Sequence, residues 1–268
     1  MLRSIFLKTL RDYRKSSIWW TIGILLMVVY IVALFPTIQT SMRGYAEMAE
    51  QFPEALKAAF GGEQGWDLFN PAGYLRTYAF SMMIPLLFLI LAVGVGSNAI
   101  AGEEEKGTLD LLLSNPVPRW QVLVEKFGAM VAYTTALASV TWLSMYLMAL
   151  TVGMDIGAGN LAAGVFSVTL LALTFGTLAL AIGAASGNRG LSTGVAVSLG
   201  IAAYVLYTMS AVVKSMRDYR LLSPWYYYAG SDPLKNGLDL GHAAVLFGLI
   251  MAFFAAALFV FRRRDISV

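Results

Sequence analysis

Six long apolar runs divide the chain, and shorter polar segments separate them. Each run reaches roughly the 20 residues that an α-helix needs to cross the hydrocarbon core of a membrane. The runs cover residues 18–36, 79–100, 127–152, 161–185, 191–213 and 243–261. This pattern predicts an all-α integral membrane protein, in which residues 1–268 form a single domain of six transmembrane helices. Small residues are frequent in the later runs, and we expect these helices to pack closely.

Residues 1–17 are predicted to form an amphipathic helix before the first span. Apolar residues recur there at helical spacing, while the remaining face is basic; the basic residues are Arg3, Lys8, Arg11, Arg14 and Lys15. The pattern indicates an interfacial helix on the cytoplasmic leaflet; a merely basic flank of the first span is the alternative. The apolar run that follows is too long for a typical signal-peptide core and lacks a clear small-x-small cleavage site, so we expect an uncleaved span.

The two longest polar stretches, residues 37–78 and 214–242, are predicted to be external loops. The second contains the aromatic cluster Trp225 to Tyr228, which suits an interfacial belt or a short re-entrant segment. Pro36 is expected near the far end of the first span, and Pro85 predicts a kink inside the second.

Six spans place both termini on one side, and the basic residues favour the cytoplasm as that side. Of the 19 Lys and Arg residues, 12 fall on the side of the termini, as the positive-inside rule requires. Four run against it, because they lie in a predicted external loop: Lys214, Arg217, Arg220 and Lys235. Either that loop opposes the rule or a segment of it re-enters the membrane.

Composition excludes several other classes of protein. With 58% hydrophobic and 13% charged residues the chain is not a soluble domain, and with no Cys it has neither disulfides nor a thiol nucleophile. The net charge of +3 comes from basic residues that flank the apolar runs. We therefore expect membrane lipids with anionic headgroups as partners, and no nucleic acid.

Motifs of enzymes are present only as weak matches. Residues 190–194 fit Gly-x-Ser-x-Gly and residues 94–99 fit a dinucleotide fingerprint, but both lie at the ends of membrane helices and not between a strand and a helix. His242 is the only histidine, so a His-pair metal site is excluded, and a satisfied interfacial residue is expected. A protease built on Ser192 and His242 would need two residues that this topology places on opposite sides of the membrane.

The chain also carries no energy source of its own. It contains no Gly-x-x-x-x-Gly-Lys-Ser/Thr loop for ATP, and no span has a clear ionisable residue near its centre that would mark a proton or ion relay. We therefore expect that the chain is not an enzyme, that it holds no cofactor or metal, and that a transporter of this kind takes its energy from a partner.

The most strongly patterned polar segment is residues 101–126, between the second and third spans. Three glutamates, Glu103, Glu104 and Glu105, lead into Gly107 and Thr108, whose hydroxyl is suited to cap the start of a short Leu-rich helix. Adjacent carboxylates diverge, so a charged surface facing a partner is favoured over a divalent-ion site. Burying a Leu is worth roughly 1.5–3 kcal/mol, so Leu109, Leu111, Leu112 and Leu113 must pack either on the chain's own helices or on a soluble partner.

This segment resembles the cytoplasmic loop of ABC-2 type transporter permeases. The pattern Glu-Glu-Lys-Gly-Thr-Leu-x-x-Leu-Leu-x-x-Pro-x-x-Arg, with a Lys seven residues further on, is complete here. Its positions run from Glu104 and Glu105 through Gly107, Thr108, Leu109, Leu112, Leu113, Pro116 and Arg119 to Lys126. The resemblance extends over essentially the whole chain, including the amphipathic first segment and the basic end at residues 261–265.

The resemblance implies a permease subunit of an ABC transporter. In that family the loop carries a coupling helix that docks in a cleft of an ATP-binding subunit, and the first segment is an elbow helix. Two permeases, as a homodimer or with a close homologue, pair with two ATP-binding subunits, which hold ATP and Mg²⁺, in a bacterial or archaeal plasma membrane. Such permeases mostly export, and the short chain with small external segments favours a small or amphipathic substrate.

Two other functions stay open at this point. A membrane scaffold or sensor would use the same docking loop without moving a substrate. A secondary transporter is the other, and the lack of carboxylates inside the spans argues against it.

Overall fold

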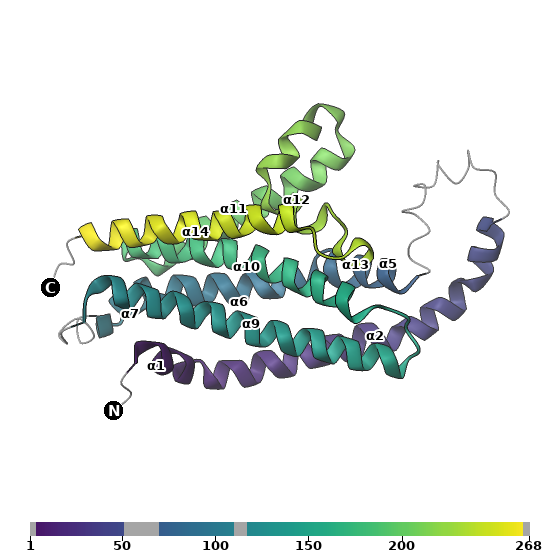
Figure 1. The fold of residues 1–268 in the computed structure, drawn as a ribbon, viewed down its shortest axis with the longest axis horizontal. Helices are drawn as coiled ribbons and strands as arrows, with labels where there is room; N and C mark the ends of the chain where they lie inside the picture. The colour runs from purple at the N-terminus through teal and green to yellow at the C-terminus, as the bar shows by residue number, and fades with distance from the viewer. Residues whose placement is uncertain (1–3, 51–69, 110–116, 265–268) are drawn as a thin grey trace.

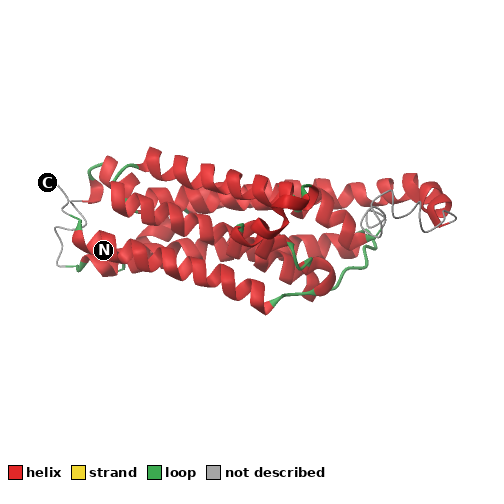
Figure 2. Ribbon diagram, turned by 90° about the horizontal axis from the view of Figure 1, so that it is seen from above, coloured by secondary structure: helices red, strands yellow, loops and turns green. Residues whose placement is uncertain are grey.

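The computed structural model describes residues 4–50, 70–109 and 117–264. All regular elements in these ranges are helical, and the long helices lie side by side in an elongated bundle (Figures 1 and 2). In chain order they are α1 (Ile5–Asp12), α2 (Arg14–Glu50), α5 (Pro71–Leu75), the π-helix η2 (Arg76–Phe80), α6 (Met83–Ala99), α7 (Ala101–Glu105), α9 (Arg119–Thr151), α10 (Ala158–Ser186), α11 (Arg189–Val212), the 3₁₀-helix η3 (Lys214–Leu222), α12 (Pro224–Ala229), α13 (Pro233–Asn236) and α14 (Leu240–Arg263).

The helices confirm an all-α fold with five or six spans in the described residues. Five helices are long and apolar enough to cross a membrane: residues 14–40 of α2, and α9, α10, α11 and α14. A sixth span exists if the pair Pro71–Phe80 and Met83–Ala99, which bends by 42°, crosses as one unit. The described ends of the chain lie at the same end of the bundle as α7 (Figure 1), as an even number of spans requires.

The first span ends later than predicted. α2 continues through Pro36 to Glu50, so the predicted external loop 37–78 begins as helix. A proline removes one backbone hydrogen bond, and a long helix tolerates that loss when its other bonds remain. Hydropathy marks where a helix leaves the apolar layer and does not mark where its hydrogen bonding stops.

The second span breaks just before its proline. The helix starts at Pro71, earlier than predicted, and is interrupted at Ser81 and Met82 between η2 and α6. Pro85 lacks the N–H that would bind the carbonyl of residue 81, so the interruption falls one turn before the proline. The predicted kink is therefore present, displaced toward the N-terminus of the span.

α10 forms the centre of the bundle. In its most apolar stretch 78% of the residues are buried, whereas the corresponding share in α11 is 17%. The backbones of α6 and α10 approach so closely that no side chain fits between them at two glycines. A Cβ atom added to Gly96 would clash with the Gly176 carbonyl, and one added to Gly176 would lie 2.9 Å from Ala92 Cβ. The small residues thus allow the close backbone approach that the sequence predicts.

Residues 214–242 are largely helical, and part of this segment belongs to the core. Trp225 and Tyr228 of α12 are only 5% and 3% exposed, so these two rings do not form an interfacial belt; the alternative of a short re-entrant segment stays a prediction. Trp225 Nε1 donates a hydrogen bond to the Gly200 carbonyl (3.2 Å), and the Tyr228 hydroxyl donates to the Phe80 carbonyl (2.6 Å). Burial raises the pKa of Tyr228 well above its ordinary value, so the phenol remains a neutral donor.

α1 is a separate helix tied to α9. The Ser4 hydroxyl and the Phe6 N–H donate hydrogen bonds to the Glu125 carboxylate, at 2.9 and 2.8 Å. The second bond satisfies a backbone N–H in the first turn of α1, which has no partner within the helix. The amphipathic segment predicted over residues 1–17 is therefore a short helix over Ile5–Asp12, followed directly by α2.

Candidate functional site

The three glutamates of α7 each bind a different partner within the chain. Glu103 forms an ion pair with Lys126 of α9; the Lys126 side chain is buried, at 4% exposure, and that of Glu103 is largely buried, at 14%. The other two carboxylates turn toward different helices, so they diverge as predicted. The described residues contain no group of His, Cys, Asp and Glu side chains that could hold a metal ion.

Glu104 is held by the end of α14. Arg264 donates from Nη2 and Nη1 to the two carboxylate oxygens of Glu104, at 2.6 and 2.8 Å, which is the bidentate geometry of strong charge-assisted pairs. The pair lies over Gly187, whose left-handed φ of 66° makes the tight turn between α10 and α11. Arg119 of α9 donates to the Arg264 carbonyl (2.5 Å), so α7, α9 and α14 meet at one point.

Glu105 completes the set of contacts. Its carboxylate accepts a hydrogen bond from the backbone N–H of Arg189, at the first residue of α11 (2.8 Å). The expectation of a charged surface facing a partner is thus corrected for Glu103 and Glu104, because their carboxylates bind the chain's own cations. We call the contacts of Glu103, Glu104, Glu105, Arg119, Lys126, Arg189 and Arg264 the α7 clasp.

The residues that follow α7 are in part buried within the chain. The Thr108 hydroxyl donates to the Glu103 carbonyl (3.1 Å), so it binds the end of α7; the helix that it is predicted to cap lies outside the described residues. Leu109 is fully buried with Leu123 and Phe261 in a small apolar cluster, which resolves the alternatives for this Leu in favour of intramolecular packing. Gly107 has φ 66° and makes the turn after Lys106.

Three predicted docking residues, Leu112, Leu113 and Pro116, lie outside the described residues. The sequence alone indicates no role in this loop for Arg264 or Arg189. One signal in the sequence points to such partners: three carboxylates lie beside apolar runs, and each carboxylate needs a cation or an N–H donor. The distance along the chain, 160 residues between Glu104 and Arg264, hides the partner from any local pattern.

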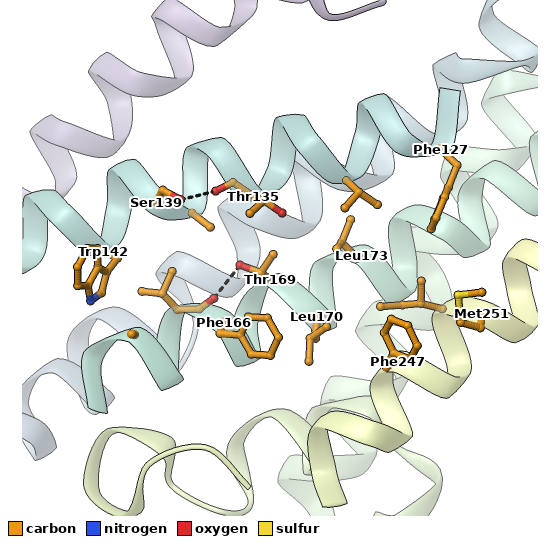
Figure 3. A pocket seen from close by; sticks show the side chains of 15 residues that line it. Phe127, Thr135, Ser139, Trp142, Phe166, Thr169, Leu170, Leu173, Phe247 and Met251 are labelled. Carbon is orange, nitrogen blue, oxygen red and sulfur yellow. Dashed lines mark hydrogen bonds between the residues drawn. The ribbon is translucent and has the colours of Figure 1, made fainter. Parts of the chain in front are cut away.

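An apolar cleft of about 600 Å³ lies between α9, α10 and α14 (Figure 3). Two of the hydroxyl groups that line it are used within their own helices: Ser139 donates to the Thr135 carbonyl (3.0 Å) and Thr169 donates to the Val165 carbonyl (2.7 Å). The cleft therefore offers apolar surface, with Phe166 and Phe247 on its walls, and is suited to hydrocarbon and not to a polar solute.

The enzyme-like motifs have structural roles. Ser192 is fully buried, and its hydroxyl donates to the Ala179 carbonyl of α10 (2.5 Å). His242 lies at the start of α14 against the rings of Tyr226 and Tyr227, at 5.1 and 5.4 Å. Its Nδ1 atom is buried and has no hydrogen-bond partner in the part of the chain that is described, so the expectation of a satisfied interfacial residue stays a prediction.

Comparison with known families agrees with this architecture. The sequence matches the family described as ABC-2 family transporter protein over residues 3–266, nearly its whole length. The chain belongs to this family. It is therefore a multi-pass membrane subunit of an ABC system, and membership implies an ATP-binding partner.

The chain is similar to several bacterial proteins. The chain is 27% identical over 241 residues to NosY of Stutzerimonas stutzeri, a probable ABC transporter permease protein, covering 78% of this chain and 86% of the relative. NosY of Pseudomonas aeruginosa is 29% identical over 62% of this chain and 61% of its own length. YhcI of Bacillus subtilis, an uncharacterized protein, is 23% identical over 70% of this chain and 66% of its own length. The chain thus spans slightly less than two thirds of two of these relatives.

Proposed function

We propose that this ABC-2 protein is the permease subunit of an exporter in a bacterial or archaeal plasma membrane, with both termini in the cytoplasm. It forms the path for the substrate and has no catalytic site; a separate subunit binds and hydrolyses ATP with Mg²⁺. The observation that carries the proposal is the α7 clasp. It joins the motif shared with ABC-2 permeases to α9, α11 and α14 through charged side chains.

The clasp gives the loop a mechanical connection to the spans. Glu103 with Lys126 and Glu104 with Arg264 are short, buried or half-buried pairs, and such pairs hold two elements in one geometry more firmly than exposed pairs do. A displacement of the loop then moves the attached helices instead of bending the loop alone. We propose that residues 107–116 dock on the ATP-binding subunit, with Leu112, Leu113 and Pro116 on the docking surface.

The assembly that this mechanism needs contains two permeases and two ATP-binding subunits. Closure of the ATP-binding pair on ATP moves both docking segments, and the spans rearrange so that the central path opens outward. α11 is suited to contact membrane lipids or the second permease, because Val197, Ile201 and Val205 leave an apolar face exposed. α1 acts in this proposal as an elbow helix at the cytoplasmic surface.

Co-purification tests the proposal directly. The chain is expressed with an ATP-binding subunit encoded by a neighbouring gene, extracted in detergent and captured by a tag, and ATP turnover is measured with and without the permease. The wild-type chain is expected to form a stable complex, and Leu112→Asp or Gly107→Pro is expected to abolish it while membrane insertion stays intact. Asp155→Asn, in the exposed turn between α9 and α10, is the control and is expected to behave as wild type.

The outcomes separate the open functions. Normal complexes with both loop variants would contradict the docking role. A stable complex that hydrolyses ATP but moves no compound in vesicles would favour a scaffold or sensor. Export of small amphipathic compounds that depends on ATP would support the permease.

A further inference from the structure

A polar cavity of about 320 Å³ lies beside the α7 clasp, among α1, α6, α7 and α9. This volume is within the range of sites for small ligands. The labels of α1 and α7 in Figure 1 mark this end of the bundle, where the described termini also lie. In the proposed orientation it is the cytoplasmic surface of the membrane, where lipid headgroups and dissolved solutes are both present.

Charged side chains of both signs line the cavity. Lys8 and Asp12 come from α1, Lys106 follows α7, and Glu103 and Lys126 form the ion pair of the α7 clasp. Three lysines face two carboxylates, so the walls carry a net charge of +1. Lys8 and Lys106 are exposed and form no ion pair with any residue that the structure describes. Their ammonium groups, with three donors each, therefore favour an anionic ligand.

Contacts within the chain hold the walls in place. Asn98 Nδ2 donates a hydrogen bond to the Tyr13 hydroxyl (3.2 Å), and the Tyr13 ring stacks on Tyr133 of α9, with centroids 5.3 Å apart. Glu125 ties the start of α1 to α9. Because these walls are fixed before binding, a ligand loses little affinity to the ordering of side chains.

The carboxylates of the cavity add a second requirement. Glu103 Oε2 is buried and has no hydrogen-bond partner among the described residues. A buried acceptor without a donor is destabilising, and a donor on a ligand would relieve that cost. Asp12 is an exposed acceptor of the same cavity. The walls are therefore suited to a ligand that carries hydroxyl groups beside its negative charge.

We propose that this cavity binds the phosphate ester of a small polyol. The phosphate binds the ammonium groups of Lys8 and Lys106, and hydroxyl groups of the polyol donate to the carboxylates of Asp12 and Glu103. A phosphate without hydroxyl groups meets these carboxylates only as like charges, whereas a polyol phosphate uses them as acceptors. The bound ligand links α1 to the loop that follows α7. Binding is a property of this chain alone and needs no ATP-binding subunit, so it goes beyond the proposed transport role.

Isothermal titration calorimetry on the purified full chain tests this chemistry. The detergent is a non-ionic polyoxyethylene, which carries neither a phosphate nor a sugar. Glycerol 3-phosphate carries both groups, propyl phosphate lacks the hydroxyls, and glycerol lacks the phosphate. Glycerol 3-phosphate is expected to bind on the order of tenfold tighter than either other probe. Equal or tighter binding of propyl phosphate or glycerol, or no binding of glycerol 3-phosphate, would overturn the proposal.

Variants of the two exposed lysines test the phosphate contact from both sides of the cavity. Lys8→Gln on α1 and Lys106→Gln after α7 should each weaken the binding of glycerol 3-phosphate on the order of tenfold, because each removes a charge-assisted hydrogen bond. Lys15→Gln makes the same change on an exposed residue of α2 outside the cavity and should leave binding unchanged. If one lysine variant fails to fold, the other still tests the contact. Unchanged affinity in the folded variants would contradict the assignment.

A variant of Asp12 separates a polyol site from a general attraction of anions. Asp12→Ala should weaken the binding of glycerol 3-phosphate, because a hydroxyl acceptor is lost, and should leave propyl phosphate bound at least as tightly, because a like charge is lost. Asp155→Ala, in the exposed turn between α9 and α10, is the control and should change neither affinity. Tighter binding of both phosphates by Asp12→Ala would refute the role of the carboxylate.

A last pair of probes separates the two sources of such a ligand. Glycerophosphoglycerol and dihexanoyl phosphatidylglycerol, below its micellar concentration, carry the same phosphodiester and hydroxyl groups without and with acyl chains. Tighter binding of the lipid identifies a membrane headgroup as the ligand, and equal or weaker binding of the lipid identifies a water-soluble polyol phosphate. Binding of neither, together with none for glycerol 3-phosphate, would remove the site.

Discussion

Replacing Lys126 by Met tests the most deeply buried contact of the α7 clasp. The Lys126 side chain is 4% exposed, and its partner Glu103 is 14% exposed, with Oε2 buried and unpartnered among the described residues. The variant leaves the Glu103 carboxylate buried without its cation. Removing one partner of a buried ion pair costs about 3–5 kcal/mol of unfolding free energy, and we expect that loss here.

Denaturant-induced unfolding of the purified chain in mixed micelles, followed by tryptophan fluorescence, measures this change. Lys106→Met removes the same charge from an exposed position three residues after Glu103. It is expected to change the free energy of unfolding by no more than about 0.5 kcal/mol. The double variant Lys126→Met with Glu103→Met removes both charges and should recover most of the loss. The reasoning is refuted if Lys126→Met is as mild as Lys106→Met, or if the double variant is no more stable than the single one.

Two further predictions concern packing and are checked by the same unfolding measurement. Gly96→Ala should destabilise the bundle by at least about 1–3 kcal/mol, because its Cβ would clash with a carbonyl of α10. Its control Gly94→Ala, where the new Cβ has no atom within 4 Å, should be neutral or stabilise the bundle by up to about 1 kcal/mol. Equal changes in the free energy of unfolding for the two variants would contradict the close approach of α6 to α10. Tyr228→Phe should cost about 1–3 kcal/mol by leaving a buried carbonyl without its donor. Tyr78→Phe, at a residue 45% exposed, should change stability by no more than about 0.5 kcal/mol, and a larger loss there than at Tyr228 would refute the role of that hydrogen bond.

The spans could be predicted from the sequence because hydropathy depends on local composition. The close packing of α6 on α10 was also accessible, since Gly96 and Gly176 belong to helices rich in small residues. The ends of the helices were less accessible. α2 extends into a polar segment as far as Glu50, where the hydropathy of the sequence no longer marks the span.

Long-range partners could not be predicted from the sequence. The charge of Glu104 shows that a cation is needed, but every basic residue at that end of the bundle satisfies the requirement equally well, and only the tertiary fold selects Arg264. Trp225 illustrates the same limit. An amphipathic ring fits a membrane interface or a core with one hydrogen-bond acceptor, and here the Gly200 carbonyl decides for the core.

The residues of the motif at 104–126 are expected to contact an ATP-binding subunit, but several of them contact this chain's own helices. Its carboxylates and Leu109 stabilise the chain itself, so the motif combines internal anchoring with the proposed docking surface. A sequence pattern alone cannot separate these two roles, because both require the same residues at the same spacing.

Site-specific photo-crosslinking measures the central claim, contact between the docking segment and an ATP-binding subunit, most directly. A benzophenone amino acid is placed at position 112, and in a second sample at position 155 in the turn between α9 and α10, and each complex is irradiated in the membrane. We predict a crosslink to the ATP-binding subunit from position 112 and none from position 155. A crosslink from position 155 with none from position 112 would contradict the account.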